Sequence, residues 1–247
     1  MRRAKNSRPR GEAAPAVIVF AREPVAGKAK TRLIPYLGAA AAAQLADAFI
    51  SDALAKASRL GGGRLVIAGS PAGALRPGGY FWRLARHYRA DLVDQGGGDL
   101  GRRMARVLSR YAQAPGAILF GTDTPSVPAA FLRQSMIALR RAPLIIAPSL
   151  DGGYYLVGVS GAVPDVFRAI DWGGPRVMEQ TMRRVRRLKI RYELGRWWYD
   201  VDRGADLEFV AADLARGPGA RRGAPGCPAT ARLLRELGLL KLAASAG

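Results

Sequence analysis

Short apolar runs of the kind that form buried strands recur along the chain, with helical segments between them. The clearest run is residues 116–123, in which the strand-forming residues are apolar throughout. Such a strand is typical of the centre of a parallel sheet, where both faces are buried. The alternation predicts an α/β fold, namely a three-layer α/β/α (Rossmann-like) arrangement around a mostly parallel central sheet. The expected strands are 16–21, 64–70, 91–94, 116–123, 143–149, 154–159 and 188–194, and the expected helices are 39–60, 100–112, 127–140, 174–187 and 229–244.

One folded domain with an extension at each end accounts for the 247 residues. Residues 1–15 are expected to be a basic disordered tail, because the apolar segment that follows is short and lacks a typical cleavage site. The folded domain is expected over residues 16–214. Residues 215–247 begin with a stretch rich in Gly, Pro and Arg, which predicts a flexible connector before a terminal helix.

Membrane insertion and disulfide bonding are both unsupported by the sequence. No stretch approaches the roughly 20 consecutive apolar residues that a membrane helix needs, so we expect no membrane span. Cys227 is the only cysteine, so an intrachain disulfide cannot form. A lone cysteine fits a reducing compartment, and we expect a cytoplasmic protein.

The formal net charge of +20 raises the question of nucleic-acid binding. Of the 39 cationic residues six are lysine and the rest are arginine, a bias that a GC-rich genome produces without selection for binding. The charge is also scattered along the chain. These features argue against a nucleic-acid partner, while the charge still favours anionic substrates.

The segment after the first expected strand has the layout of a phosphate-binding loop. It contains Gly27 and then the cations Lys28, Lys30 and Arg32. A Walker-type loop is excluded, because Arg22 occupies its first glycine position and no Ser or Thr follows Lys28. If the segment is extended, the three cations lie on one side and could surround a di- or triphosphate. The alternative is a solvated basic loop.

Carboxylates at strand ends suggest a metal site. Asp123 follows the most apolar strand, and Asp200 and Asp202 stand on alternate residues of a later segment. Magnesium commonly binds one or two carboxylates together with substrate phosphates. Two alternatives stay open: Asp123 could cap the following helix, and Asp202 could cap the helix that begins at 203.

Two glycine-containing turns could also contact a ligand. Asp151, Gly152 and Gly153 join two expected strands, so they form either an anion-binding turn or a plain hairpin. The loop that begins at Gln95 contains three consecutive glycines; it could press against a nucleobase or could merely be flexible. The single histidine, His87, lies on a basic surface, so histidine-dependent catalysis has little support.

Six ordered segments together resemble one bacterial family. They are FAREPVAGKAKTRL, QGGGDLGRRM, GTDTPSVP, DGGYYLVG, IDWGGPRVMEQT and DVDRGADL, and they span roughly residues 16 to 212. The resemblance is to the DUF2064 group, whose members are often labelled glycosyltransferases within the nucleotide-diphospho-sugar transferase superfamily of GT-A fold. More distantly, the chain looks like the molybdenum-cofactor and 2-phospholactate guanylyltransferases.

The resemblance implies a role for each matching residue. It makes Asp123, Lys30 and Arg32 catalytic and gives the divalent metal, Mg²⁺ or Mn²⁺, to Asp123 with Asp200 or Asp202. The nucleotide would be bound by Arg22, Gly27, Lys28, Lys30, Arg32, Gln95, Gly98 and Gly101, and the acceptor by Asp151, Gly152, Gly153 and Tyr154. Arg22 departs from the Lys that is common in relatives, and residues 203–205 depart from their Thr-Pro-Glu.

The expected activity is a metal-dependent transfer from an NDP-sugar or an NTP to a small acceptor. Such catalysis relies on positioning and electrostatics and needs no covalent nucleophile. The resemblance favours glycosyl transfer, whereas the basic loop and the single Asp of GTDTP favour nucleotidyl transfer. The rival functions are nucleic-acid binding and catalytically silent nucleotide binding. An oligomer is compatible with the sequence.

Overall fold

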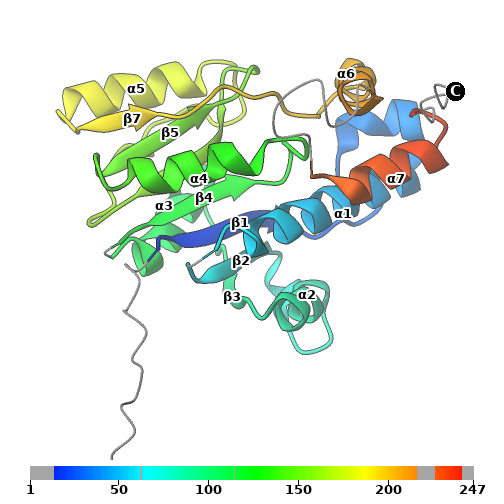
Figure 1. Ribbon diagram of the computed structural model, residues 1–247, viewed down its shortest axis with the longest axis horizontal. Helices are drawn as coiled ribbons and strands as arrows, with labels where there is room; N and C mark the ends of the chain where they lie inside the picture. Colours follow the sequence, from blue (N-terminus) through cyan, green and yellow to red (C-terminus); the bar gives the residue numbers. More distant parts are fainter. Residues whose placement is uncertain (1–13, 62, 114, 216–225, 241–247) are drawn as a thin grey trace, which may run out of the picture.

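The computed structural model describes residues 14–61, 63–113, 115–215 and 226–240. The strands are β1 (Ala16–Arg22), β2 (Leu65–Ser70), β3 (Asp91–Asp94), β4 (Ala117–Gly121), β5 (Leu144–Pro148), β6 (Tyr154–Val159) and β7 (Tyr192–Leu194). They form one sheet in the order β3-β2-β1-β4-β6-β5-β7 (Figure 1). All neighbouring strands are parallel except β6, which is antiparallel to β4 and β5. The expected α/β fold with a mostly parallel sheet is confirmed.

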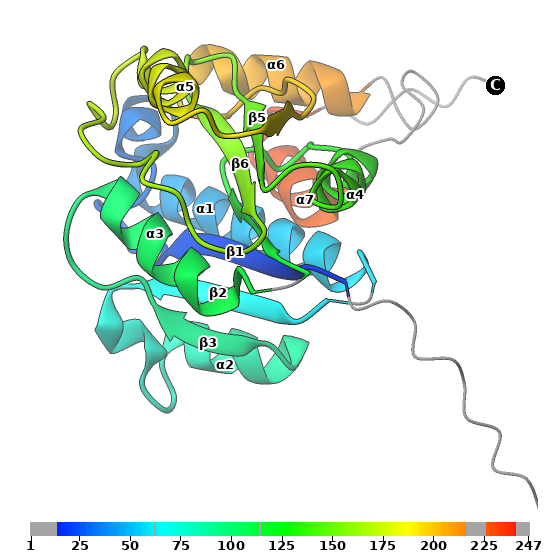
Figure 2. The ribbon, with the colours of Figure 1, turned by 90° about the vertical axis from the view of Figure 1, so that its left-hand side faces the viewer.

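Helices cover both faces of the sheet (Figures 1 and 2). They are α1 (Ile34–Ser58), α2 (Tyr80–Tyr88), α3 (Leu100–Tyr111), α4 (Ala129–Ala138), α5 (Val177–Arg187), α6 (Gly204–Ala215) and α7 (Pro228–Glu236), with short 3₁₀ turns η1 (Thr31–Leu33) and η2 (Ala72–Leu75). Helices α1, α2, α4, α6 and α7 share one hydrophobic cluster, and α3 and α5 share the other. Val17 and Val19 belong to the first cluster and Ile18 to the second, as strand alternation requires.

Most expected elements are present within a few residues, and one difference has a local cause. The strand expected over 188–194 is reduced to β7. Lys189 adopts a left-handed conformation (φ 53°), and residues 188–190 close the end of α5 instead. The segment around His87, expected to be a basic helical surface, belongs to helix α2, and only Phe81 and Ala85 of its nine residues are buried.

The ends of the chain are described only in part. Of the expected basic tail, residues 1–15, residues 1–13 lie outside the described residues, and so does most of the expected connector, at 216–225. Helix α7 ends at Glu236, before the end expected at 244, and residues 241–247 are again outside the described part.

The stretch from Thr31 to Ser58 is long and apolar enough to cross a membrane, judged by length and composition alone. Gln44, Asp47 and Asp52 interrupt this stretch, so the expectation that no run approaches about 20 consecutive apolar residues holds. Within the fold, α1 runs alongside the sheet, and Leu45, Phe49 and Leu54 are fully buried (Figure 1). A core helix of this kind meets the same criteria as a membrane helix.

Two charged residues of α1, Asp52 and Lys56, are buried one helical turn apart. The Asp52 carboxylate accepts hydrogen bonds from the backbone amides of Ala229 (2.9 Å) and Thr230 (2.8 Å) and from the Thr230 hydroxyl (2.6 Å). Asp52 thereby satisfies the free amides at the start of α7. The Lys56 ammonium donates to the carbonyls of Pro125 (2.8 Å) and Val127 (2.6 Å), in the loop after β4. Helix α1 therefore fixes both α7 and that loop.

Lys56 predicts a pH dependence of stability. Burial lowers its pKa from 10.5 to about 8, against the opposing charge of Asp52. The unfolded chain then binds more protons than the folded chain between these two values, so this residue's contribution to the free energy of unfolding rises with pH. We expect wild type to gain about 1 kcal/mol over Lys56→Met between pH 7 and pH 9.

Urea unfolding of both proteins at each pH measures this difference. Lys189→Met, which removes an exposed lysine, serves as the matched control and is expected to follow wild type. Parallel pH profiles for wild type and Lys56→Met would contradict the assignment of a lowered pKa to Lys56.

Candidate active site

Four aspartates meet at the edge of the sheet where β1, β4 and β5 end. Asp123 follows β4, and Asp151 lies in the turn between β5 and β6. The segment after β7 brings the other two, Asp200 and Asp202. Its Val201 amide donates to the Asp123 carbonyl (2.8 Å), and its Trp198 carbonyl accepts from the Leu150 amide (3.0 Å). Ligands of open α/β sheets bind at this edge, so the carboxylates lie where a site is expected.

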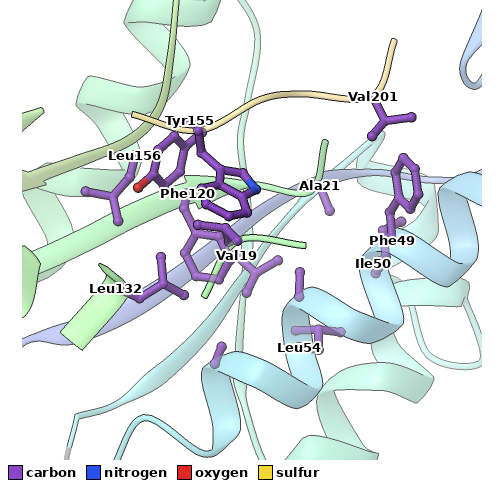
Figure 3. Close-up of a cluster of buried hydrophobic side chains, with 14 of the residues drawn as sticks. Val19, Ala21, Phe49, Ile50, Leu54, Phe120, Leu132, Tyr155, Leu156 and Val201 are labelled. Atoms are coloured by element: carbon purple, nitrogen blue, oxygen red, sulfur yellow. The ribbon is translucent and has the colours of Figure 1, made fainter. Parts of the chain in front are cut away.

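The direction of Asp200 and Asp202 follows from the residue between them. Val201 is fully buried and lies beside Phe49 in the hydrophobic cluster on the α1 side (Figure 3). In extended backbone, neighbouring side chains point to opposite sides. Asp200 and Asp202 therefore face away from the core and toward the site.

Lys30 lies among these carboxylates. Its ammonium is 2.6 Å from Asp123 Oδ1 and 2.8 Å from Asp202 Oδ1, and it donates to the Val201 carbonyl (2.8 Å). Only 8% of the Lys30 side chain is exposed, whereas Asp123 is half exposed. Burial alone would lower the pKa of Lys30, but the two carboxylates outweigh burial and raise it. Lys30 is therefore charged and holds Asp123 and Asp202 together.

The loop that carries Lys30 is not extended, which corrects the expectation for its three cations. Gly27 (φ 78°) and Lys30 (φ 45°) both have left-handed conformations, and the chain between them turns. Lys28 is exposed, Lys30 is turned inward, and Arg32 lies at the rim with Nη1 4.0 Å from Asp202 Oδ2. The three cations do not form one row.

Asp151 and Asp200 form a second pair of carboxylates. Burial alone would raise the pKa of Asp151, but hydrogen bonds from the Ser149 hydroxyl and the Gly153 amide (2.8 Å) outweigh it and lower that pKa. Burial, reinforced by the charge of Asp151, raises the pKa of Asp200 to about 7. Asp200 Oδ1 is buried and has no hydrogen-bond partner among the described residues. Asp200 is the carboxylate of this pair that carries a proton near neutral pH.

The alternative capping roles are taken by other residues. Helix α4 begins after Pro128 with no side-chain cap, so Asp123 does not cap it. At the start of α6, the Asp206 carboxylate accepts from the amides of Asp202 (2.9 Å) and Arg203 (2.7 Å). Asp206 thus binds the two amides just before α6, and the Asp202 side chain accepts from Lys30.

The glycine-rich loop before α3 places its expected site residues differently. Gln95 is buried, and its amide group donates to the carbonyls of Ala21 and Ala68, both at 2.8 Å. Its two amide hydrogens are therefore engaged within the protein. Gly101 is also buried. A side chain there would not fit, because its Cβ would lie 2.6 Å from the Phe167 carbonyl oxygen and from the Trp172 ring. Gly98 (φ 100°) is the exposed member of this expected set.

The expected acceptor turn is a hairpin that joins β5 to β6, and its binding of an acceptor stays a prediction. Its Asp151 nevertheless belongs to the aspartate cluster. Gly152 (φ 90°) is required by packing, since a Cβ would lie 1.9 Å from the Pro175 carbonyl oxygen. Tyr154 points into the protein: its hydroxyl is buried, and its ring makes an edge contact with Trp172.

A family model for bacterial proteins described as uncharacterized and conserved, DUF2064, matches residues 51–174, half of the chain. The chain belongs to the DUF2064 family. The match ends before Asp200 and Asp202, so the carboxylate pair contributed by the later segment lies outside it. No curated protein matches this DUF2064 chain.

Solved structures support the fold of this DUF2064 protein. A protein of Desulfovibrio desulfuricans G20, provisionally named a nucleotide-diphospho-sugar transferase, is 29% identical; the match covers 92% of this chain and 96% of that one, with a TM-score of 0.78. Rv0371C of Mycobacterium tuberculosis H37Rv, in complex with manganese, is 19% identical over 77% and 92% of the two chains (TM-score 0.39). The 2-C-methyl-D-erythritol 4-phosphate cytidylyltransferase of Thermus thermophilus is 18% identical over 94% and 87% (TM-score 0.33). The last two likenesses are too weak to carry an argument.

The donor set of the DUF2064 site fits a divalent cation. The oxygen ligands are hard, and the partnerless Asp200 Oδ1 is a buried acceptor of the kind that a cation satisfies. Among the residues that the structure describes, however, no three His, Cys, Asp or Glu side chains converge on one point. Lys30 lies between Asp123 and Asp202 and supplies the positive charge there.

Sequence reasoning missed several residues that position the site. Ser149 holds Asp151, Asp206 caps α6, and Lys56 holds the loop after Asp123. Arg103 contacts Gln95 and lies near the end of β1. The spacing of Asp206 from the start of α6 is a usable capping signal, whereas nothing near Lys56 or Arg103 in the sequence indicates their partners.

Proposed function

We propose that this DUF2064 protein is a metal-dependent transferase that uses a nucleotide or nucleotide-sugar donor and a small acceptor. The observation that carries the proposal is the meeting of Asp123, Asp200 and Asp202 with Lys30 at the carboxyl edge of the sheet. The similarity to the D. desulfuricans protein, 29% identical over nearly the whole chain, supports a nucleotide-related transferase. A cytoplasmic location stays a prediction.

A divalent cation, Mg²⁺ or Mn²⁺, would be held by Asp123 together with Asp200 or Asp202, and when bound it would stabilise negative charge on the departing phosphate portion of the donor. Lys30 keeps Asp123 and Asp202 in place. The pKa of Asp200 is raised to about 7, so Asp200 is partly protonated near neutral pH and the negative charge of the cluster is reduced. Arg32 at the rim is placed to meet an anionic group of the donor.

Glycosyl and nucleotidyl transfer remain the two candidate reactions. The name of the D. desulfuricans relative favours an NDP-sugar donor. The single carboxylate directly after β4, in place of an Asp-x-Asp pair, favours an NTP donor. The complete set of four aspartates argues against a catalytically silent nucleotide binder.

A thermal-shift screen of NTPs, NDPs and NDP-sugars tests the proposal. A ligand at about 100 times its Kd stabilises the folded protein by about 2.7 kcal/mol, which raises the Tm of a protein of this size by about 5–10 °C. We expect one ligand class to produce this shift with Mg²⁺ and a smaller shift with EDTA. Stabilisation by an NDP-sugar would identify a glycosyl donor, and stabilisation by an NTP would identify a nucleotidyl donor.

The screen can also contradict the proposal. If no nucleotide raises the Tm at millimolar concentration, the site does not bind a nucleotide donor. If EDTA leaves the shift unchanged, the donor binds without a metal and the aspartates have another purpose.

A further inference from the structure

Two arginines lie close together on the α3 side of the sheet, at the end of β1. Phe20 and Arg22 are two residues apart in β1, so their side chains project to the same side. Phe20 packs against the hydrophobic cluster that contains residues of α3, which identifies that side. The Arg103 guanidinium, from α3, lies 5.9 Å from the centre of the Phe20 ring. Arg22 and Arg103 therefore face the same region at the carboxyl edge of the sheet.

Arg103 is held in place by a buried amide. Its Nη1 donates to Gln95 Oε1 at 3.0 Å, and the Gln95 amide group is itself bound to the carbonyls of Ala21 and Ala68. The Nε atom of Arg103 is buried and has no hydrogen-bond partner among the described residues. A guanidinium that is anchored at one nitrogen keeps further donors in a fixed fork. Gln95 thus acts as a support for Arg103.

Neither of these arginines is paired with a carboxylate of the described residues. In the described part of the chain, neither forms an ion pair with a carboxylate within 4.0 Å. Asp99, the nearest acidic influence on Arg103, caps α3 and pairs with Arg102 (3.7 Å). Burial, and then the charge of Arg22, lower the pKa of Arg103. Two uncompensated like charges at a ligand-binding edge are expected where an anion supplies the missing charge.

We infer that Arg22 and Arg103 form an anion-binding position for a phosphate group of the donor. The inference deepens the proposed function and rests on it. Arginine forks match phosphate oxygens in pairs. Lys30, the buried cation of the neighbouring loop, is already engaged by Asp123 and Asp202, so it has less capacity for phosphate than these two arginines. In this assignment the two arginines bind phosphate, while Lys30 forms ion pairs with the carboxylates of Asp123 and Asp202.

Isothermal titration with inorganic pyrophosphate, in EDTA and at low salt, tests the inference without a metal or a nucleotide. Arg103→Gln and Arg22→Gln are each expected to raise the Kd for pyrophosphate by about tenfold or more, because each removes charge-assisted hydrogen bonds. Arg103→Lys, which keeps the charge but loses the fork, is expected to lie between wild type and Arg103→Gln. Arg102→Gln is the matched control, because it removes the same charge from the residue next to Arg103. The Arg102 side chain is 79% exposed. The Kd of this variant is expected to stay within twofold of wild type.

Several results would overturn the inference. They are the failure of wild type to bind pyrophosphate, equal weakening by Arg102→Gln, and unchanged affinity in Arg22→Gln. Arg22 is exposed, so that last variant tests the site without disturbing packing even if Arg103→Gln misfolds.

The same variants separate this inference from the proposed function. Normal Mg²⁺-dependent stabilisation of Arg22→Gln and Arg103→Gln by the nucleotide found in the screen would overturn the inference and leave the proposed function standing. Pyrophosphate binding that depends on both arginines, in a protein that no nucleotide stabilises, would keep the anion position and remove the proposed function. A raised KM for the donor, with the KM for the acceptor unchanged, is expected if the phosphate belongs to the donor. The reverse pattern would overturn the assignment to the donor.

Discussion

Asp123→Asn is expected to lower turnover by about 10²–10³-fold while the protein stays folded. The substitution removes a carboxylate that is half exposed, so the core is not disturbed, and Lys30 keeps its contact with Asp202. It removes one negative charge at the point where the site would hold a cation and orient the donor. Steady-state kinetics with the donor identified by thermal shift, together with circular dichroism, measure the two parts of the prediction.

Asp165→Asn is the matched control for this experiment. Asp165 has a similar exposed fraction, 58% against 52%, and also forms a single short ion pair, with Arg184 at 2.8 Å. It lies outside the aspartate cluster, so its loss is expected to leave turnover unchanged. Full activity in Asp123→Asn would remove this carboxylate from the active site, and equal losses in both variants would indicate a general effect of charge.

Lys30→Met is expected to lower the free energy of unfolding by about 2–3 kcal/mol. The ammonium makes three contacts in a buried position, and without it Asp123 and Asp202 face each other uncompensated. Removing one partner of a fully buried pair costs more than this, and the value is reduced here because water reaches Asp123. Urea unfolding in EDTA measures the loss.

Magnesium gives this prediction a second readout. A divalent cation can supply the charge that Lys30 provides, so Mg²⁺ is expected to restore part of the lost stability in Lys30→Met. The control is Lys28→Met, two residues earlier in the same loop and exposed, which is expected to match wild type with and without Mg²⁺. Wild-type stability in Lys30→Met would show that the ion pairs contribute nothing to folding.

The strands of the central sheet were predictable because their signal is local. The run before Asp123 is apolar on both faces, and β4 lies in the middle of the sheet as that pattern predicts. The direction of β6 is not encoded in the same way, since an apolar strand reads alike in either direction. The hairpin at residues 151–153 was the available signal, because a short turn can only join antiparallel strands.

Within the site, too, the features that follow from local sequence were predictable and the long-range contacts were not. The position of Asp123 follows from the end of one strand, and the facing of Asp200 and Asp202 follows from their alternation around Val201. The partner of Lys30 does not follow from any local pattern, because Asp202 is 172 residues away in sequence. The prediction that Lys28, Lys30 and Arg32 lie on one side was wrong because of the backbone conformation. Turns at Gly27 and Lys30 place the lysine inside the site, and spacing in an extended chain cannot anticipate this.

The contacts of helix α1 show which C-terminal residues belong to the folded unit that carries the site. Asp52 receives three hydrogen bonds from the start of α7, and one turn later Lys56 grips the loop that follows Asp123. A shortened protein that stopped after α6 would keep every strand of the sheet. It would nevertheless leave the buried Asp52 carboxylate without its hydrogen-bond donors. Asp52 lies one helical turn from Lys56, which positions the loop after Asp123. The folded unit therefore extends beyond its last strand and beyond the family match, and it includes α7.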